Sequence, residues 1–152
     1  ECAQGVGGYA RPMPASWMER QAKAVHERAK LADIVITTAL IPGRKAPTLL
    51  SAETVAQMKP GSVVIDLAAA QGGNCPLTVA DQVVQENGVT IVGPTNLPAQ
   101  VGADASALYA RNLLDFMKLL FDKDGALVIN LEDDIVAACL MCRDGQVVRK
   151  NG

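Results

Sequence analysis

Residues 33–68 read DIVITTALIPGRKAPTLLSAETVAQMKPGSVVIDLA, and this stretch decides the fold. The runs DIVITTA (33–39) and SVVIDLA (62–68) are rich in β-branched residues, which favour strands. Between them, SAETVAQM predicts a short helix that ends at Lys59-Pro60-Gly61. A third β-branched run, VTIVG, follows at 89–93. Strands separated by a helix at this spacing predict parallel β-α-β units.

The composition narrows the class of protein. A chain of 152 residues predicts one domain, or a large piece of one. The net charge of −2 argues against a nucleic-acid binder and against a polybasic membrane-surface protein. Because only 3% of the residues are aromatic, the apolar mass is Ala, Val, Leu and Ile, as in helices packed on a buried parallel sheet. Charges, Gly and Pro interrupt every apolar stretch before the length of about 18 residues that indicates a membrane span. Four cysteines are too few for a disulfide scaffold and favour a reducing compartment.

The remaining elements lie at the two ends. Residues 1–15 are rich in Gly and Pro and predict a mobile loop. Ser16 and Glu19 have the spacing of a capping box and predict the start of a helix. A long helix is predicted over 104–121, and its apolar side consists of Leu108, Leu113, Leu114, Met117, Leu120 and Phe121. Beyond it, ALVINL, IVAACLMC and QVVR predict short strands, the last two joined by a hairpin at residues 143–145.

Three motifs with possible chemistry have plainer explanations. The letters G-x-G-x-x-A occur at residues 5–10, but no strand precedes them and no helix follows, so we interpret them as loop. Cys139 and Cys142 form a single C-x-x-C pair, and we expect ordinary strand residues on opposite faces rather than zinc ligands or a redox pair. His26, the only histidine, is expected to be a partly exposed helix residue.

The carboxyl ends of the predicted parallel strands remain as a candidate site. The loops at 37–47, 66–74 and 93–100 are rich in Gly, Ala and Pro. In an open α/β sheet, ligands bind at this edge, where small residues let the backbone approach a flat ring or a ribose. The alternative is that these segments are tight turns between strands and helices.

The same loops carry a resemblance to a known family. TTALIPG-x-x-AP, MKPGSVVIDLA, GGNCPLT, VGPTNLPAQ, ADASALYARNLL and LEDDIV occur in this order along the chain. Together they resemble the NAD(H)-binding domain I of proton-translocating nicotinamide nucleotide transhydrogenase, which is the alpha subunit in bacteria. Alanine dehydrogenases share the fold and the ALIPG-x-x-AP and MKPGSVVID motifs, whereas GGNCPLT and LYARNLL favour the transhydrogenase.

The resemblance implies an α/β fold with a partial, Rossmann-like parallel sheet. It implies that 1–103 are the C-terminal part of the NAD-binding subdomain, with the mobile loop at 1–15. Residues 104–121 would be a crossover helix, and 122–152 would return to a second subdomain as short antiparallel strands. The family's glycine fingerprint, its ribose-binding acidic residue and its Arg-Gln-Asp loop lie upstream of these motifs. We therefore expect part of a domain with one exposed sheet edge, which alone binds NADH weakly or not at all.

The resemblance also implies a cofactor site without a catalytic side chain or a metal. Gly8, Tyr9 and Ala10 would belong to a mobile loop that closes over the nucleotide. Gln21 and Leu40 would contact NAD. Residues in the same motif would surround Leu40: Thr38, Ala39, Pro42 and Gly43.

The implied activity is hydride transfer between NAD(H) here and NADP(H) on a partner domain III, coupled by a membrane domain to proton flow. The implied location is the cytoplasmic side of a bacterial inner membrane, or the matrix side in mitochondria, with a homodimer formed through domain I and no nucleic acid bound. Two alternatives stay open. One is an NAD-dependent alanine dehydrogenase, and the other is a truncated, catalytically inactive interaction module.

Overall fold

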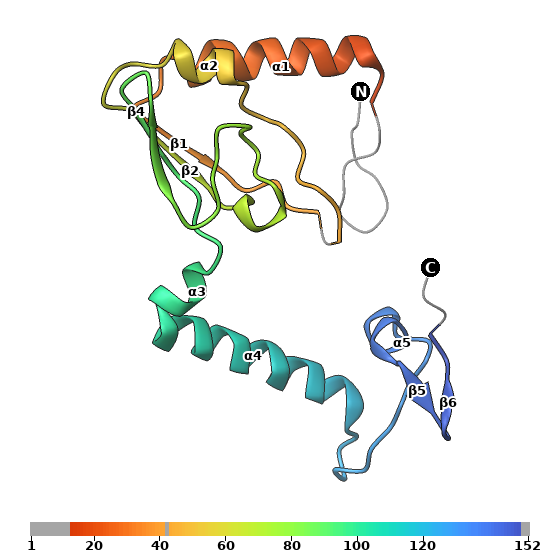
Figure 1. Ribbon diagram of the computed structural model, residues 1–152. Helices are drawn as coiled ribbons and strands as arrows, with labels where there is room; N and C mark the ends of the chain where they lie inside the picture. The colour runs from red at the N-terminus through yellow and green to blue at the C-terminus, as the bar shows by residue number, and fades with distance from the viewer. Residues whose placement is uncertain (1–12, 42, 150–152) are drawn as a thin grey trace. The chain divides into compact units, whose positions relative to one another are not determined.

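The computed structural model describes residues 13–41 and 43–149, which form two compact units (Figure 1). The first unit ends at Leu97, and the second begins at Pro98. All strands of the larger sheet belong to the first unit, whereas the long helix and a small hairpin belong to the second.

The first unit is built on a four-stranded sheet in the order β1-β2-β4-β3. β1 (Ile34–Thr37), β2 (Val63–Asp66) and β4 (Val89–Val92) run parallel, with Thr37 beside Asp66 in the register of β1 and β2. These strands coincide with the three β-branched runs, so the predicted parallel α/β arrangement is confirmed.

β1 lies at one edge of the sheet and pairs, among the described residues, with β2 alone. Its side chains alternate, so Val35 and Thr37 face inward while Ile34 and Ile36 are 65% and 60% exposed. An exposed edge was expected from the family resemblance, and the structure has one here.

The opposite edge corrects the prediction of a three-stranded sheet. β3 (Val83–Glu86) pairs antiparallel with β4 and was not predicted. The two strands are joined at Asn87-Gly88, where φ is 51° and 77°. Positive φ at both central residues is the backbone of a tight hairpin turn, for which Asn-Gly is a preferred pair.

The helices of the first unit differ in how they begin. α1 (Ala15–Ala29) starts after Pro14 without a side-chain cap, so the predicted capping box at Ser16 and Glu19 is wrong, because Ser16 already lies inside the helix. α2 (Ala52–Ala56) confirms the short helix predicted between the first two strands. Its cap is Ser51, whose Oγ accepts a hydrogen bond of 3.1 Å from the Thr54 amide.

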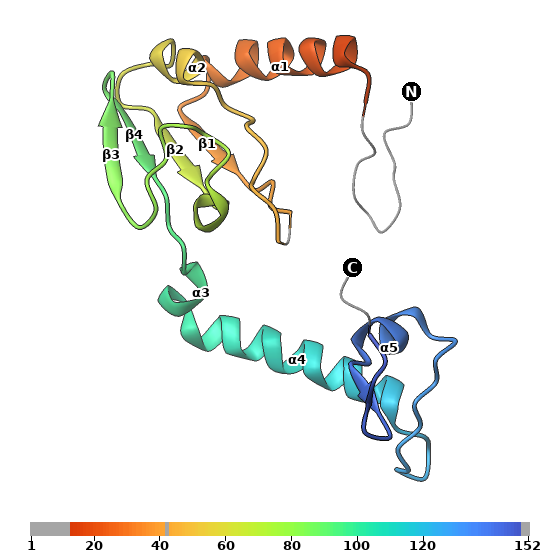
Figure 2. The same ribbon diagram turned by 45° about the vertical axis from the view of Figure 1, so that its right-hand side comes forward.

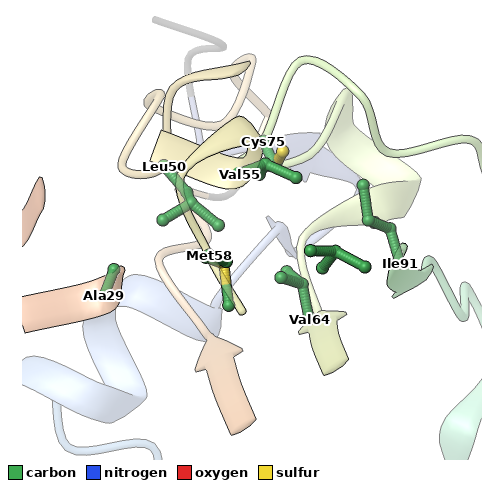
Figure 3. Close-up of a cluster of buried hydrophobic side chains, with 8 residues drawn as sticks. Ala29, Leu50, Val55, Met58, Val64, Cys75 and Ile91 are labelled. Atoms are coloured by element: carbon green, nitrogen blue, oxygen red, sulfur yellow. The ribbon is translucent and has the colours of Figure 1, made fainter. Parts of the chain in front are cut away.

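The core of the first unit fills the space between the sheet and these helices. Figure 2 shows the order of the strands, with α1 and α2 side by side. Apolar side chains from both helices, β2, β4 and the intervening loops meet in one buried cluster (Figure 3). Its members are Ala29, Leu50, Val55, Met58, Val64, Cys75, Val89 and Ile91. Since Ala29 is the only residue of α1 in this cluster, α1 is attached to the core mainly near its C-terminus.

The boundary between the units falls within α3 (Leu97–Gln100). The second unit contains the long helix α4 (Gly102–Leu120), which confirms the helix predicted at 104–121. The apolar side of α4 is exposed: Leu108 is 66% and Leu114 is 55% accessible. No helix within the described ranges is long and apolar enough to cross a bilayer.

The last segment corrects the strand prediction for IVAACLMC. Most of that run forms α5 (Asp134–Cys139), because the carboxylate of Asp133 caps the helix by accepting the amides of Ile135 and Val136 at 2.9 and 3.0 Å. ALVINL forms no strand and contributes only an isolated bridge between Leu127 and Phe121.

The predicted hairpin at residues 143–145 is confirmed, although its strands are short. β5 (Cys142–Arg143) pairs antiparallel with β6 (Gln146–Val147) through Asp144-Gly145, where φ is 51° and 76°. The same two positive φ values occur in the turn between β3 and β4, so both hairpins use one turn geometry.

Candidate functional site

The carboxyl ends of β1, β2 and β4 lie at one edge of the sheet, since the three strands are parallel. The loops that leave this edge are the Gly-, Ala- and Pro-rich segments singled out in the sequence. Two buried polar side chains, Asp66 and Asn74, hold these loops. Both residues lie within the second of these loops, where no sequence motif assigned either of them a role.

Asn74 fastens the loop that follows β1. Its Nδ2 donates to the carbonyls of Ala39 and Pro47, both at 2.8 Å, and its Oδ1 accepts the amide of Ala39 at 3.1 Å. The side chain is fully buried, so these three bonds are shielded from water. One amide group thus fixes both ends of the loop that contains Leu40 and Gly43.

Asp66, the last residue of β2, holds Asn74 in turn. Its Oδ2 accepts the backbone amides of Asn74 and Cys75 at 2.7 and 3.1 Å and the Thr78 hydroxyl at 2.7 Å. Its Oδ1 accepts the amide of Ala68 at 3.0 Å. A buried carboxylate that accepts four donors is well compensated for its loss of hydration. The chain of bonds therefore runs from β2 through Asn74 to the loop after β1.

Glycine is required at two positions of this edge. A methyl group at Gly73 would lie 2.7 Å from Asp66 Oδ2, and one at Gly93 would lie 2.6 Å from the carbonyl oxygen of Val79. Both distances are shorter than any ordinary contact of a carbon atom. The close approach of these loops consequently depends on the absence of a side chain.

The third loop is tied to the start of β3 by Asp81. Its carboxylate accepts the backbone amide and the hydroxyl of Thr95 at 2.9 and 2.7 Å. These hydrogen bonds lower the pKa of Asp81 below its ordinary value, and the bond from the Thr95 hydroxyl has the larger effect. The loop after β4 is therefore fixed at the same edge as the other two.

A cavity of about 360 Å³ opens between α1 and this edge. It is lined by two residues of α1, five of β1 and the loop after it, and two that precede α2: Gln21 and Val25; Val35, Ile36, Thr37, Thr38 and Ala39; Leu49 and Leu50. Its size lies within the range of small-molecule sites, and its lining combines apolar walls with a few polar groups, as such sites do.

The cavity brings together three of the predicted site residues: Gln21, Thr38 and Ala39. Leu40 and Gly43 do not line it, although Leu40 follows directly and is 42% exposed. The other four predicted residues, Gly8, Tyr9, Ala10 and Pro42, lie outside the described residues. Contact of any of the nine with a nucleotide stays a prediction.

Sequence reasoning missed Thr37. Its Oγ1, at the carboxyl end of β1, is the one buried side-chain oxygen in the described part of the chain that has no hydrogen-bond partner. Threonine is common in strands for its shape alone, so nothing in the run DIVITTA marks this hydroxyl. Thr37 lines the cavity, whereas its hydroxyl oxygen is buried within the unit.

A second, more polar cavity of about 340 Å³ lies between α1 and α2. Leu49 lines both cavities. Beside it, His26 Nδ1 is 2.8 Å from Thr54 Oγ1, which is 2.8 Å from Ser51 Oγ. His26 is half-buried in a helix, in agreement with the prediction.

The cysteines do not form a site among the described residues. Cys139 ends α5 and Cys142 begins β5, so they do not share a strand as predicted, and both are exposed. No group of metal-ligating side chains occurs in the part of the chain that the structure describes. Cys75 is buried, and this burial raises the pKa of its thiol.

Comparisons with known proteins agree on the family. The alanine dehydrogenase/PNT C-terminal domain model matches residues 8–150. An NAD(P) transhydrogenase alpha subunit from Rhodospirillum rubrum is 50% identical over 147 residues, covering 96% of this chain and 38% of the relative. Alanine dehydrogenase 1 from Staphylococcus aureus is 41% identical over 101 residues, 64% of this chain and 27% of the relative.

Solved structures agree with these matches. A transhydrogenase from Sinorhizobium meliloti superposes with a TM-score of 0.74 at 44% identity, over 90% of this chain and 38% of that one. An L-alanine dehydrogenase superposes with a TM-score of 0.61 at 32% identity, over 84% and 36%. The chain thus spans well under half of the length of each of these relatives.

Proposed function

The chain belongs to the alanine dehydrogenase/PNT family, and from this premise we propose that it forms one wall of the NAD(H) site of a transhydrogenase. The observation that carries the proposal is the cavity at the carboxyl edge of the sheet, where Gln21, Thr38 and Ala39 meet. The stronger match to transhydrogenase alpha subunits, which extends over nearly the whole chain, supports transhydrogenase over alanine dehydrogenase.

In the proposed reaction, bound NAD(H) exchanges a hydride with NADP(H) held by a partner domain. Direct transfer between two nicotinamide rings needs position and shielding rather than an acid or base side chain. The residues of this chain fit that task. The apolar walls of the cavity shield the ring from water, Gln21 offers hydrogen bonds, and Asn74 fixes the loop that contains Leu40.

The proposal includes the surroundings of the site. We assign 1–103 to the nucleotide-binding subdomain, 104–121 to a crossover helix and 122–152 to a second subdomain. The partners would be an NADP(H)-binding domain III, a proton-translocating membrane domain, and a second copy of domain I. This places the chain on the cytoplasmic side of a bacterial inner membrane, or on the matrix side in mitochondria.

A titration with NADH tests the nucleotide site. Trp17, the single tryptophan, lies on α1 one turn before Gln21, and reduced nicotinamide absorbs where tryptophan emits. Residues 1–152 alone are expected to bind NADH weakly or not at all, so the titration uses a domain that also contains the upstream part of the site. In that domain we expect saturable NADH binding that is weaker after Gln21→Ala. Gln57→Ala, an exposed glutamine of the same unit, is the matched control and should leave the titration unchanged. In the domain with the upstream part present, NADH binding that never saturates would refute the site and favour the interaction module.

A second assay separates the two enzyme activities. A transhydrogenase domain should transfer hydride to an NADP analogue only after a purified NADP(H)-binding domain is added. An alanine dehydrogenase, which 41% identity over part of the chain keeps as the second candidate, should instead oxidise NADH with pyruvate and ammonia. Activity in the second mixture alone would overturn the transhydrogenase assignment.

A further inference from the structure

We propose that His26 is a positioning residue of the nucleotide site and that its hydrogen-bonded chain to Thr54 and Ser51, here called the clasp, joins the two walls of the cavity. The inference rests on the proposed function. It starts from the observation that α1 and the segment before α2 both line the cavity.

One wall is α1, which contributes Gln21 and Val25. Along α1 only Ala29 is buried, and nearly all residues before Val25 are exposed. The part of α1 that contributes Gln21 therefore extends beyond the last strong apolar contact. Among the described residues, His26 is the only side chain of α1 that hydrogen-bonds to another element.

The other wall is Leu49 and Leu50, which precede the cap of α2 directly. Leu50 belongs to the buried hydrophobic cluster, so the packing of the core fixes this wall. Ser51 comes next in the chain and is the far end of the clasp. The three polar residues thus connect α1, five residues after Gln21, to the segment that forms the opposite wall.

The three side chains can form a continuous series of donors and acceptors. Ser51 Oγ already accepts the Thr54 amide at 3.1 Å, so its own proton is free for Thr54 Oγ1 at 2.8 Å. Thr54 can then donate its hydroxyl proton to the Nδ1 of a neutral His26 at 2.8 Å. Because Thr54 is 3% exposed, water competes poorly for its hydroxyl.

The consequence for the site is geometric. Gln21 lies little more than one helical turn from His26, so a small tilt of α1 about its C-terminal attachment moves the Gln21 amide relative to Thr38 and Ala39. A hydrogen bond to a ligand weakens steeply when its geometry is lost. The clasp therefore acts on nucleotide affinity through Gln21, and His26 does not need to touch the ligand.

The experiment compares Thr54→Val, which keeps the shape but removes the hydroxyl, with Thr54→Ser, which keeps the hydroxyl. Both leave the backbone bond that caps α2. Three quantities are measured: the dissociation constant of NADH, the quenching of Trp17 by acrylamide, and the melting temperature. We expect Thr54→Val to raise the dissociation constant about 3- to 10-fold and to increase quenching, which reports a looser α1. Thr54→Ser should stay within about 2-fold of the parent protein.

A purely structural role has a different signature. If Thr54→Val lowers the melting temperature but leaves the dissociation constant and the quenching unchanged well below that temperature, the proposal is wrong. His26→Leu and His26→Asn repeat the comparison from the other end of the clasp, since asparagine keeps a polar group near the position of Nδ1. If the Thr54→Val variant does not fold, the two His26 variants test the proposal. We expect His26→Leu to weaken NADH binding more than His26→Asn does.

Failure of the proposed function is recognised separately. If the parent domain, with the upstream part of the site present, binds no NADH, the nucleotide site is refuted. Acrylamide quenching of Trp17 then tests the clasp by itself. Increased quenching in Thr54→Val, restored by serine, would still support the attachment of α1 by His26. Equal quenching in all variants would overturn it.

Discussion

Replacing Asp66 by asparagine should destabilise the first unit strongly, although the two side chains have the same shape. The carboxylate is fully buried and accepts four hydrogen bonds, three at Oδ2 and one at Oδ1. An amide can turn its oxygen toward the three donors, but its NH₂ group then faces the amide of Ala68 at 3.0 Å. One bond becomes a contact between two donors, and the other three lose their charged acceptor.

The size of the effect follows from these contacts. A hydrogen bond to a charged group contributes about 1.5–3 kcal/mol net, and a neutral one about half of that. Loss of one bond and weakening of three should lower the free energy of unfolding by about 4–7 kcal/mol. For a chain of this size that is a fall in melting temperature of about 8–28 °C.

Urea unfolding followed by far-UV circular dichroism measures the change. The matched control is Asp33→Asn in the same unit, where the carboxylate pairs with Lys59 Nζ at 2.9 Å but is 83% exposed. Such a surface pair should contribute less than about 1 kcal/mol. If Asp66→Asn is no more destabilising than Asp33→Asn, Asp66 does not hold the loops as described.

Three further changes test other parts of the fold. Gly93→Ala places a methyl group 2.6 Å from a backbone carbonyl and should cost about 2 kcal/mol in thermal melts, whereas Gly102→Ala meets nothing within 4 Å and should be neutral or stabilising. Iodoacetamide with peptide mass spectrometry should modify Cys139 well before Cys75, whose burial raises the pKa of its thiol; equal rates would contradict this. Because hydrogen bonds lower the pKa of Asp81 below 3.8, its ionised form stabilises the fold above the ordinary pKa, and this contribution is lost as pH falls through the lowered value; an NMR titration midpoint at or above 3.8 would refute it.

The parallel strands were predictable because buried parallel strands contain continuous β-branched runs. The helix α4 was predictable from its long apolar periodicity. In contrast, IVAACLMC is a short apolar run that fits a strand or a buried helix turn equally well, and the decision lies with the Asp133 cap. For β3, the Asn87-Gly88 pair indicated a hairpin turn. The strand before it was not predicted because most of its residues are exposed and it lacks a clear buried face.

The site shows the other limit of sequence reasoning. A site at the carboxyl ends of the strands is a prediction from topology, and Thr38 and Ala39 follow β1 at that edge. The roles of Asp66 and Asn74 depend on partners that only folding brings near. Asn74 bonds to a residue 35 positions earlier in the chain, and no spacing rule for a local motif reaches so far.

The uncovered edge of β1 has a thermodynamic consequence. Any strand that paired with β1 in parallel would end at the same edge of the sheet, and its outgoing loop would face the cavity beside Gln21 and Thr38. A ligand that contacts both β1 and the added strand would then bridge the two paired strands. Completion of the sheet and capture of the ligand would become linked equilibria, in which each strengthens the other by the same factor.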